Sequence, residues 1–345
     1  LNSLSNPEDI KIGFESTAHY ALNLELFLEN AHHSFMEVNP VLIKEYKKST
    51  TLRRTKTDSV DCESIARWLM TVEYKPHSKG FYHAYSLKSL TRLRDRLIRQ
   101  RSFYLVKITN VLDHTFPEFK PFFNERLSKT ALYLLENYGS AEKMARMNSA
   151  SYDKLRCISR GKFSIQQFLR LKELAANTVG VNNSIFDLEL NTLLTLYKSL
   201  SDEINTLETE IIKLIEEVHP HYMSIPGIGP ISAAVIYAEY GDISNFSNPG
   251  QMLAFAGIEP GINDSGTESH GGRMVKHGSS QLRYVLLNSC LPLIRFDLTF
   301  ATYYAKKRAE GKKHRVAITH VAKKLIRVIY ALERQDVDFN VQKLR

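Results

Sequence analysis

The stretch Ile10-Lys11-Ile12-Gly13-Phe14 alternates apolar side chains with Lys and Gly, a pattern typical of a β-strand. Apolar residues at helical spacing follow from Tyr20 to Leu28. Ser34-Phe35-Met36-Glu37-Val38 predicts a second strand, which ends where Pro40 can occupy the first turn of another helix. The order strand, helix, strand, helix predicts an α/β domain at residues 1–80.

Three carboxylates lie where these elements end or begin. Glu15 follows the first predicted strand, while Asp58 and Asp61 stand at the start of a helix predicted to reach Met70. A spacing of three residues puts both aspartates on one helix face. Converging carboxylate oxygens can hold a pair of Mg²⁺ ions for in-line phosphoryl transfer, one ion activating the attacking oxygen and the other stabilising the leaving oxygen. The alternative is that the aspartates only complement the helix dipole.

A helical region is predicted at residues 81–218. Apolar residues recur at helical spacing from Leu87 to Val111, with basic residues on the other faces. A second helix carries a sustained heptad seam, formed by Phe186, Leu190, Leu193, Tyr197, Leu200, Ile204, Leu207, Ile211, Leu214 and Val218. These two helices predict either an intramolecular hairpin or a surface that assembles several chains. Residues 113–184, between them, predict short helices with loops.

A mainly helical C-terminal domain is predicted at residues 219–345. It opens with a stretch rich in Pro and Gly, Ser224-Ile225-Pro226-Gly227-Ile228-Gly229-Pro230, and continues as an apolar helix to Tyr240. This is the form of a helix-hairpin-helix, in which Gly227 and Gly229 let backbone amides approach a nucleic-acid phosphate. A Gly-Pro turn between packed helices is the alternative.

A glycine-rich stretch from Gly257 to Gly278 holds a candidate nucleophile. Ser265 is followed by Gly266, and the cations Arg273, Lys276 and Arg283 come downstream. A serine hydroxyl can attack a phosphodiester while cations stabilise the negative charge that develops on phosphorus. The alternative is a solvent-exposed turn.

The charge of the chain points toward a polyanion. The formal net charge is +9 at pH 7, and basic residues gather between Tyr303 and Arg327, among them Lys312, Lys313 and Arg315. Such a surface can contact phosphates, although a solvated helix face has the same composition.

The apolar runs, the cysteines and the N-terminus bear on membrane association and on cellular compartment. No stretch approaches the roughly 18 uninterrupted apolar residues of a membrane helix, and we expect no membrane association. Cys62, Cys157 and Cys290 are far apart and form no zinc-binding or disulfide pattern, which favours the cytoplasm. The chain opens with Leu1 and carries no signal-peptide pattern, which suggests a trimmed N-terminus.

Taken in order, these residues resemble the transposases and invertases of the Piv-like DEDD class, whose better-known members are guided by a structured bridge RNA. The N-terminal block resembles the family's RuvC-like nuclease domain, of ribonuclease H fold. The C-terminal block, residues 222 to 290, resembles its transposase domain. The matching motifs are Gly13-Phe14-Glu15-Ser16-Thr17-Ala18-His19-Tyr20, Val38-Asn39-Pro40, Lys56 to Ala66, Pro226-Gly227-Ile228-Gly229, Ala256-Gly257-Ile258-Glu259-Pro260, Ser265-Gly266 and Gly278 to Arg283.

The resemblance implies a composite active site. Glu15, Asp58 and Asp61 fall on the second, third and fourth acidic positions of the family and would bind Mg²⁺. The nucleophile falls on Ser265, with Ser279 and Ser280 as weaker candidates. The implied partners are DNA, a structured guide RNA and other copies of the chain in a homodimer or tetramer.

The family's first aspartate lies on a strand that has no counterpart before Ile10, because Leu1 to Asp9 is polar and contains proline. We therefore expect a partial nuclease domain with an incomplete ligand set. The predicted function is a DNA transposase or site-specific recombinase. Two alternatives remain open, a non-catalytic nucleic-acid-binding remnant of such an enzyme and a RuvC-like structure-specific nuclease.

Overall fold

The computed structural model describes residues 10–15, 21–38, 40–50, 57–74, 81–124, 127–265 and 268–340. It divides into two compact units, Leu1–His83 and Ala84–Arg345. The polar lead 1–9, the motif residues 16–20 and 39, and most of the polar break before Thr57 lie outside the described residues.

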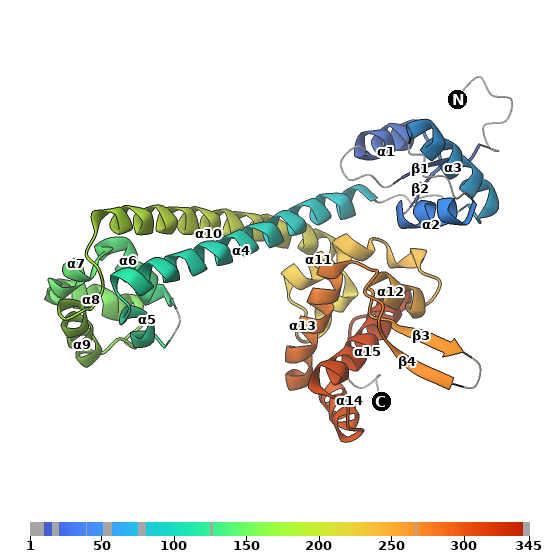
Figure 1. Ribbon diagram of the computed structural model, residues 1–345. Helices are drawn as coiled ribbons and strands as arrows, with labels where there is room; N and C mark the ends of the chain where they lie inside the picture. The colour runs from blue at the N-terminus through green and yellow to red at the C-terminus, as the bar shows by residue number, and fades with distance from the viewer. Residues whose placement is uncertain are drawn as a thin grey trace. The chain divides into compact units, whose positions relative to one another are not determined.

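The first unit is a small α/β assembly (Figure 1). Strands β1 (Ile12–Glu15) and β2 (Phe35–Val38) are parallel, with Glu15 opposite Val38. The helices of this unit are α1 (Ala21–Asn30), α2 (Pro40–Thr50) and α3 (Asp58–Thr71). The predicted order of strands and helices is therefore confirmed for the described residues.

Helix α3 packs closely on strand β1. A Cβ atom at Gly13 would lie 2.5 Å from Cδ1 of Leu69, so this position has no room for a side chain unless Leu69 moves. Leu69 belongs to a core with Val38, Ile43 and Ile65. This packing fixes the helix that carries Asp58 and Asp61 against the strand that ends at Glu15.

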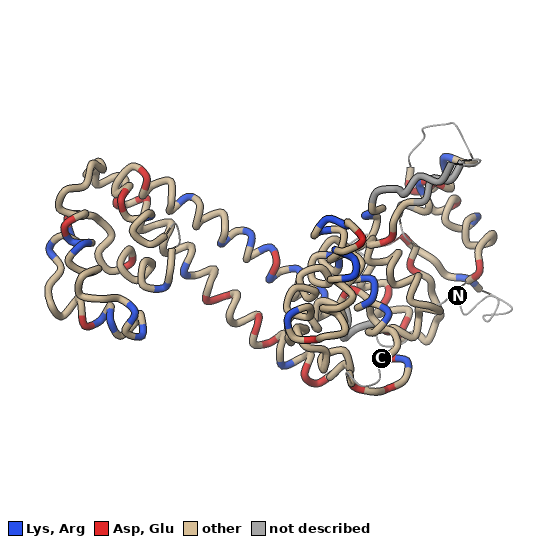
Figure 2. The backbone as a smooth tube through the Cα atoms, turned by 90° about the horizontal axis from the view of Figure 1, so that it is seen from below, with Lys and Arg blue, Asp and Glu red and all other residues tan. Residues whose placement is uncertain are grey.

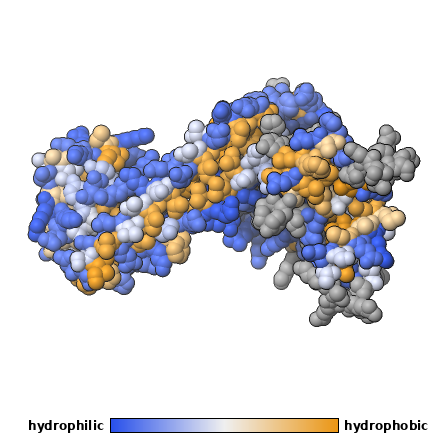
Figure 3. Space-filling model, turned by 90° about the horizontal axis from the view of Figure 1, so that it is seen from above, coloured by the Kyte–Doolittle hydropathy of each residue, from blue (hydrophilic) through white to orange (hydrophobic). Residues whose placement is uncertain are grey.

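In the second unit, α4 (Phe81–Thr115) and α10 (Ser184–Val218) form an intramolecular antiparallel hairpin (Figure 1). Leu87, near the start of α4, shares a core with Ile215 near the end of α10, whereas Ile108 shares a core with Leu190 at the other end. Apolar side chains follow the hairpin along its length (Figure 3). Within the chain, the hairpin buries part of the heptad seam, including Leu190, Ile204 and Ile211, while other seam residues stay partly exposed.

Between the hairpin helices the chain forms a cluster of short helices. They are α5 (Phe119–Phe122), α6 (Lys129–Tyr138), α7 (Ala141–Ala145), α8 (Ser149–Ile158) and α9 (Ile165–Ala176). Side-chain oxygens of Ser128, Ser140, Asn148 and Ser164 cap α6 to α9 in turn. The cluster packs on the end of the hairpin around Phe116, Leu134 and Leu171.

The remaining elements build the C-terminal core. They are η2 (His221–Ser224), α11 (Pro230–Tyr240), η3 (Ile243–Asn245), α12 (Pro249–Phe255), β3 (Pro260–Ser265), β4 (Glu268–Met274), α13 (Ser280–Phe296), α14 (Leu298–Ala309) and α15 (His314–Gln335). Helix α15 supplies much of this core, including Val321, Leu325 and Ile329. In the described part of the chain no single helix is long and apolar enough to span a membrane, although α13 and α14 pass that test together as a pair bent by 107°.

The glycine-rich stretch, for which an exposed turn was the alternative interpretation, forms a β-hairpin. Strands β3 and β4 pair antiparallel, and the register shifts between Pro260 and Ile262. The sequence lacks the β-branched and aromatic alternation that identifies strands. The hairpin is held by backbone hydrogen bonds, which do not depend on a side-chain pattern.

Candidate active site

The predicted metal ligands lie in the first unit. Glu15 is the last residue of β1, and Asp58 and Asp61 occupy the first turn of α3. Thr57 fixes the start of this helix, because its hydroxyl accepts a hydrogen bond from the backbone N–H of Val60. The carboxylate of Asp61 forms an ion pair with Lys47 of α2.

The donor chemistry of these residues suits Mg²⁺, since all three offer carboxylate oxygens and Mg²⁺ prefers oxygen ligands. Their positions, however, do not form a complete metal-binding group. The residues that the structure describes contain no group of three His, Cys, Asp or Glu side chains able to hold a metal ion. Asp58 and Asp61 share one helix turn, but Lys47 neutralises Asp61. A cation at Asp61 would therefore compete with the ammonium group of Lys47 for this carboxylate.

The candidate nucleophile lies at the tip of the C-terminal hairpin. Ser265 is the last residue of β3, and its backbone is paired with Glu268, the first residue of β4. Arg273 belongs to β4. Lys276, just after β4, is exposed and has a positive φ of 58°.

The base of this hairpin is held by a tight junction between two glycines. Gly257 has a φ of +63°, and a Cβ at Gly278 would collide with the carbonyl oxygen of Phe255. Nη1 of Arg283 donates to the carbonyl oxygens of Ala256, at 3.1 Å, and of Gly278, at 3.5 Å. Arg283 therefore joins the segments before and after the hairpin, and its role in binding nucleic acid stays a prediction.

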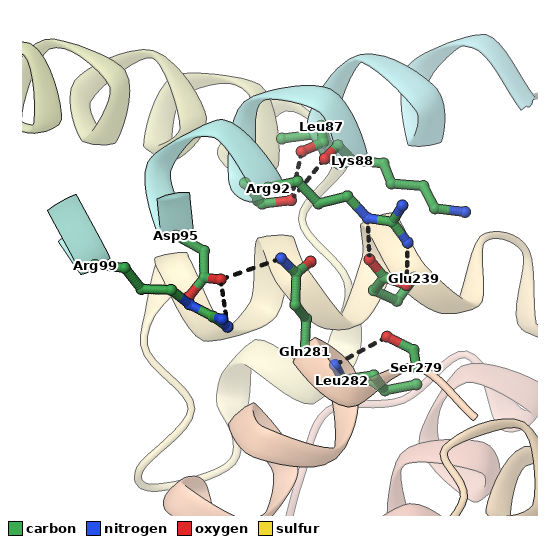
Figure 4. Close-up of polar contacts among 10 residues, drawn as sticks. Leu87, Lys88, Arg92, Asp95, Arg99, Glu239, Ser279, Gln281 and Leu282 are labelled. Atoms are coloured by element: carbon green, nitrogen blue, oxygen red, sulfur yellow. Dashed lines mark hydrogen bonds and ion pairs between the residues drawn. The ribbon is translucent and has the colours of Figure 1, made fainter. Parts of the chain in front are cut away.

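The weaker serine candidates lie at the start of α13. The hydroxyl of Ser279 accepts the backbone N–H of Leu282 at 3.2 Å and so caps this helix (Figure 4). Ser280 is its exposed first residue. Capping α13 gives Ser279 a structural role that requires no reaction with phosphate.

The predicted helix-hairpin-helix has a short 3₁₀ helix, η2, before the turn, followed by α11. Gly227 has a φ of +97°, and a Cβ there would lie 2.9 Å from Cγ of Pro292. Gly229 is the N-cap of α11, and a Cβ there would meet no neighbour within 4 Å. Gly227 thus serves packing, whereas Gly229 leaves the helix N-terminus open to a ligand.

The segment after α15 is fastened to η2 through His221. Its two ring nitrogens lie 2.9 Å from carboxylate oxygens of Asp338 and Asp336. These hydrogen bonds raise the pKa of His221 above its ordinary value, Asp338 having the larger effect. The backbone N–H of Phe339 donates to the hydroxyl of Ser224 at 2.8 Å.

The basic region surrounds the connection between α14 and α15. Lys312, Lys313 and Arg315 are exposed, and Lys313 is the N-cap of α15 without a side-chain capping bond. Partial burial, followed by the charges of Lys307 and nearby lysines, lowers the pKa of His320. The smaller contribution from the lysines reflects their positive charge, which is what a surface that binds anions requires.

Two interactions of this unit escaped the sequence analysis. Arg92 of α4 forms two hydrogen bonds with the buried Glu239 of α11, and Gln281 of α13 donates to Asp95 of α4 at 3.4 Å (Figure 4). A lone glutamate in the apolar segment leading to Tyr240 was the available signal for a buried ion pair. Its partner, 147 residues away, is visible only in the fold.

Comparisons with protein families match both ends of the chain. The DEDD transposase model of the IS110 type, described as a transposase, matches residues 1–117. A second model, described as the transposase IS116/IS110/IS902 family, matches residues 220–305. The first match includes Glu15, Asp58 and Asp61, and the second includes Ser265.

Individual relatives agree with these matches. A 43.6 kDa protein of insertion element IS110 from Streptomyces coelicolor is 29% identical over 66% of this chain and 58% of its own length. A 42 kDa protein of insertion element IS900 from Mycobacterium paratuberculosis is 28% identical over 81% of this chain and 71% of its own. The transposase for insertion sequence element IS1111A of Coxiella burnetii is 25% identical over 75% of this chain and 59% of its own.

The aligned part of this chain thus spans less than two thirds of the Streptomyces and Coxiella proteins. Both family models match in the order that the resemblance predicts, with the carboxylate unit first and the serine-bearing hairpin second. The chain belongs to the IS110 family of DEDD transposases.

Proposed function

We propose that this chain is a DNA transposase or site-specific recombinase that cleaves and rejoins strands at the ends of a mobile element and at its target. The observation that carries the proposal is the match of two transposase family models to the two segments that hold the candidate chemistry. The first segment supplies carboxylates and the second supplies a serine within a basic, glycine-rich region.

In this proposal the hydroxyl oxygen of Ser265 attacks a DNA phosphorus atom. A bond from Oγ to phosphorus forms, the bond to one deoxyribose oxygen breaks, and the proton of the hydroxyl passes to the departing strand as it becomes a free hydroxyl. A strand hydroxyl from the recombining DNA then attacks the phosphoserine and restores Ser265. No water enters, so the number of phosphodiester bonds is conserved.

Glu15, Asp58 and Asp61 would hold Mg²⁺ in this proposal, and the bound cation would stabilise negative charge on the phosphate oxygens. Mg²⁺ bound at Asp61 would compete with Lys47 for the carboxylate and could release it. Lys47 would then be free to form an ion pair with a DNA phosphate.

Nucleic acid would be held by backbone amides near Gly227 and Gly229 and by the exposed cations of the C-terminal domain. The exposed cations are Lys276, Lys312, Lys313 and Arg315. Arg273 is proposed to contribute from β4, and Arg283 to act chiefly by fixing the hairpin base. The proposed partners are DNA, a structured guide RNA and further copies of the chain as a homodimer or tetramer. The three cysteines are free thiols, which supports the cytoplasm as the proposed compartment.

A second candidate function is nucleic-acid binding without cleavage. It is favoured by the ion pair between Lys47 and Asp61, and by the absence of a three-carboxylate group among the residues that the structure describes. In that case the chain would hold DNA or a guide RNA through its basic surfaces alone.

The test is strand cleavage of DNA that carries the ends of the element, with the flanking transcript and Mg²⁺. We expect Ser265→Ala to abolish cleavage and the covalent protein–DNA adduct while DNA binding persists. The matched control is Ser280→Ala, at the exposed first residue of α13, which should leave both unchanged. Cleavage that survives Ser265→Ala would identify a structure-specific nuclease, and binding without cleavage in the unsubstituted chain would identify a purely binding protein.

A further inference from the structure

The outer face of α4 is strongly basic. This helix carries seven Lys and Arg residues against two Asp, whereas α10, its partner in the hairpin, carries eight Asp and Glu against two Lys. Figure 2 shows this contrast as blue segments on one long helix and red segments on the other. Pairing between the two helices explains only part of this charge contrast. One such pair joins Arg94 of α4 to Glu208 of α10.

Apart from Arg94 and Arg101, the basic residues of α4 share one face. An α-helix turns by about 100° per residue, so positions at steps of three and four residues lie in a common arc. This arc holds Lys88, Arg92, Arg96, Arg99 and Lys107, together with Phe103 and Val106. Asp95, which pairs with Arg99, lies at its edge. At a rise of about 1.5 Å per residue the arc extends for about 29 Å.

Some cations of this arc already form ion pairs, and others do not. Arg92 is bound to Glu239, and Arg99 is paired with Asp95 one turn before it. Arg96 and Lys107 are exposed and have no ion-pair partner among the described residues. The ring of Phe103 is 57% exposed, and Nζ of Lys107 lies 5.5 Å from its centroid.

We propose that this face of α4, the α4 basic face, is a docking surface for the phosphate backbone of duplex DNA. The identity of the polyanion as DNA rests on the proposed function. Because α4 packs against α10 along its opposite side, only its basic face is free to contact DNA. It therefore cannot insert into the major groove as an isolated recognition helix does. It lies instead along the backbone, with Arg96, Arg99 and Lys107 contacting phosphates and Phe103 contacting deoxyribose.

Contacts of this kind position a protein without reading base sequence. The α4 basic face therefore adds affinity outside the catalytic region, on a rigid element that is continuous with the C-terminal core. Leu87 and the Arg92–Glu239 pair join α4 directly to that core. Duplex DNA held by α4 would be fixed relative to the helices that follow Glu239.

The test is fluorescence anisotropy with a labelled 30-base-pair DNA, measured over a range of salt concentrations for the full chain. The variant is Arg96→Gln with Lys107→Gln. Loss of two phosphate contacts should lower the slope of log affinity against log salt by about 1.8, equivalent to up to about 60-fold weaker binding at 0.1 M salt. The matched control is Lys198→Gln with Lys213→Gln, which removes the same charge from exposed positions of α10 and should change binding less than twofold.

Each other outcome overturns the proposal in a distinct way. Equal losses in variant and control would show a general charge effect. A loss confined to a duplex RNA of the same length would assign the face to RNA, and a change in molar mass with DNA binding intact would assign it to another copy of the chain. Wild-type chain that binds no DNA would contradict the proposed function itself, whereas strong binding unaffected by the variant would contradict only the role of α4.

Discussion

Arg92 and Glu239 lie 147 positions apart in the chain, yet two hydrogen bonds of 3.0 and 3.1 Å join the guanidinium to the two carboxylate oxygens. The side chain of Glu239 is 2% exposed, whereas that of Arg92 is 49% exposed. A carboxylate in the core of the C-terminal helices is thus compensated by an arginine from the long hairpin. The pair links α4 to α11 by charge as well as by apolar packing.

Substituting Arg92→Met should destabilise the second unit by about 3 kcal/mol, because it leaves the buried carboxylate of Glu239 without a cation. The double variant Arg92→Met with Glu239→Met should recover most of that loss, since no charge remains buried. Urea unfolding of the single and double variants measures both values. A single variant as stable as the wild type would show that water already solvates Glu239.

Substituting Gly278→Ala should weaken the base of the β3–β4 hairpin. The added methyl group would collide with the carbonyl oxygen of Phe255 and with the backbone nitrogen of Gly257, so the two segments must separate. We expect a loss of about 1–3 kcal/mol of unfolding free energy and, on the proposed function, a much larger loss of DNA cleavage than of DNA binding. The matched control is Gly311→Ala, at a glycine where a Cβ would meet no neighbour within 4 Å.

Gly311 has a φ of +79°, so its substitution is itself expected to cost about 1 kcal/mol through backbone strain. Cleavage is the decisive readout for this pair of variants. If both glycine variants cleaved DNA equally well, the junction between Gly257 and Gly278 would have no role in positioning Ser265.

Substituting Lys47→Met should strengthen Mg²⁺ binding in the first unit, because it removes the ammonium group that neutralises Asp61. Titration with Mg²⁺, followed by NMR of the backbone amides of Asp58 and Asp61, measures the affinity without any cleavage assay. Asp61→Asn should abolish the response in the Lys47→Met background. The absence of any change at Glu15, Asp58 or Asp61 in all three proteins would refute the metal prediction.

The contact of His221 with Asp338 and Asp336 should make stability depend on pH. The pKa of His221 is raised in the folded chain, while the unfolded value is about 6.5. The protonated form is therefore favoured by folding. Its stabilising contribution is complete below about pH 6.5 and is lost as the pH rises through the folded pKa.

Thermal unfolding between about pH 6.5 and pH 9 checks this dependence. His221→Asn should flatten the curve in that range, and Asp338→Asn should shift the decline to lower pH because it removes the stronger hydrogen bond. The other acid facing His221 is Glu333, whose pKa is raised chiefly by burial and which accepts the backbone N–H of Tyr222. A His221→Asn variant with the wild-type pH profile would place the titrating group elsewhere.

Much of the secondary structure could be predicted from local patterns. The heptad seam from Phe186 to Val218 coincides with α10, because a helix repeats its buried face every three to four residues whatever it packs against. Asp58 was predicted as the first residue of a helix, and Thr57 caps that helix there. The β3–β4 hairpin was missed because its pairing depends on the backbone of a partner strand and not on a periodic side-chain pattern.

The sequence by itself determined the family and the two segments that carry the candidate chemistry, since motif order and residue type are properties of the chain. Only the tertiary structure decided how particular charges are used. It pairs Lys47 with Asp61, turns Arg283 inward to two carbonyl groups, and joins Arg92 to Glu239. These assignments depend on which distant segments meet, because hydrogen bonds form only within about 3 Å and ion-pair energies weaken with distance and solvent screening.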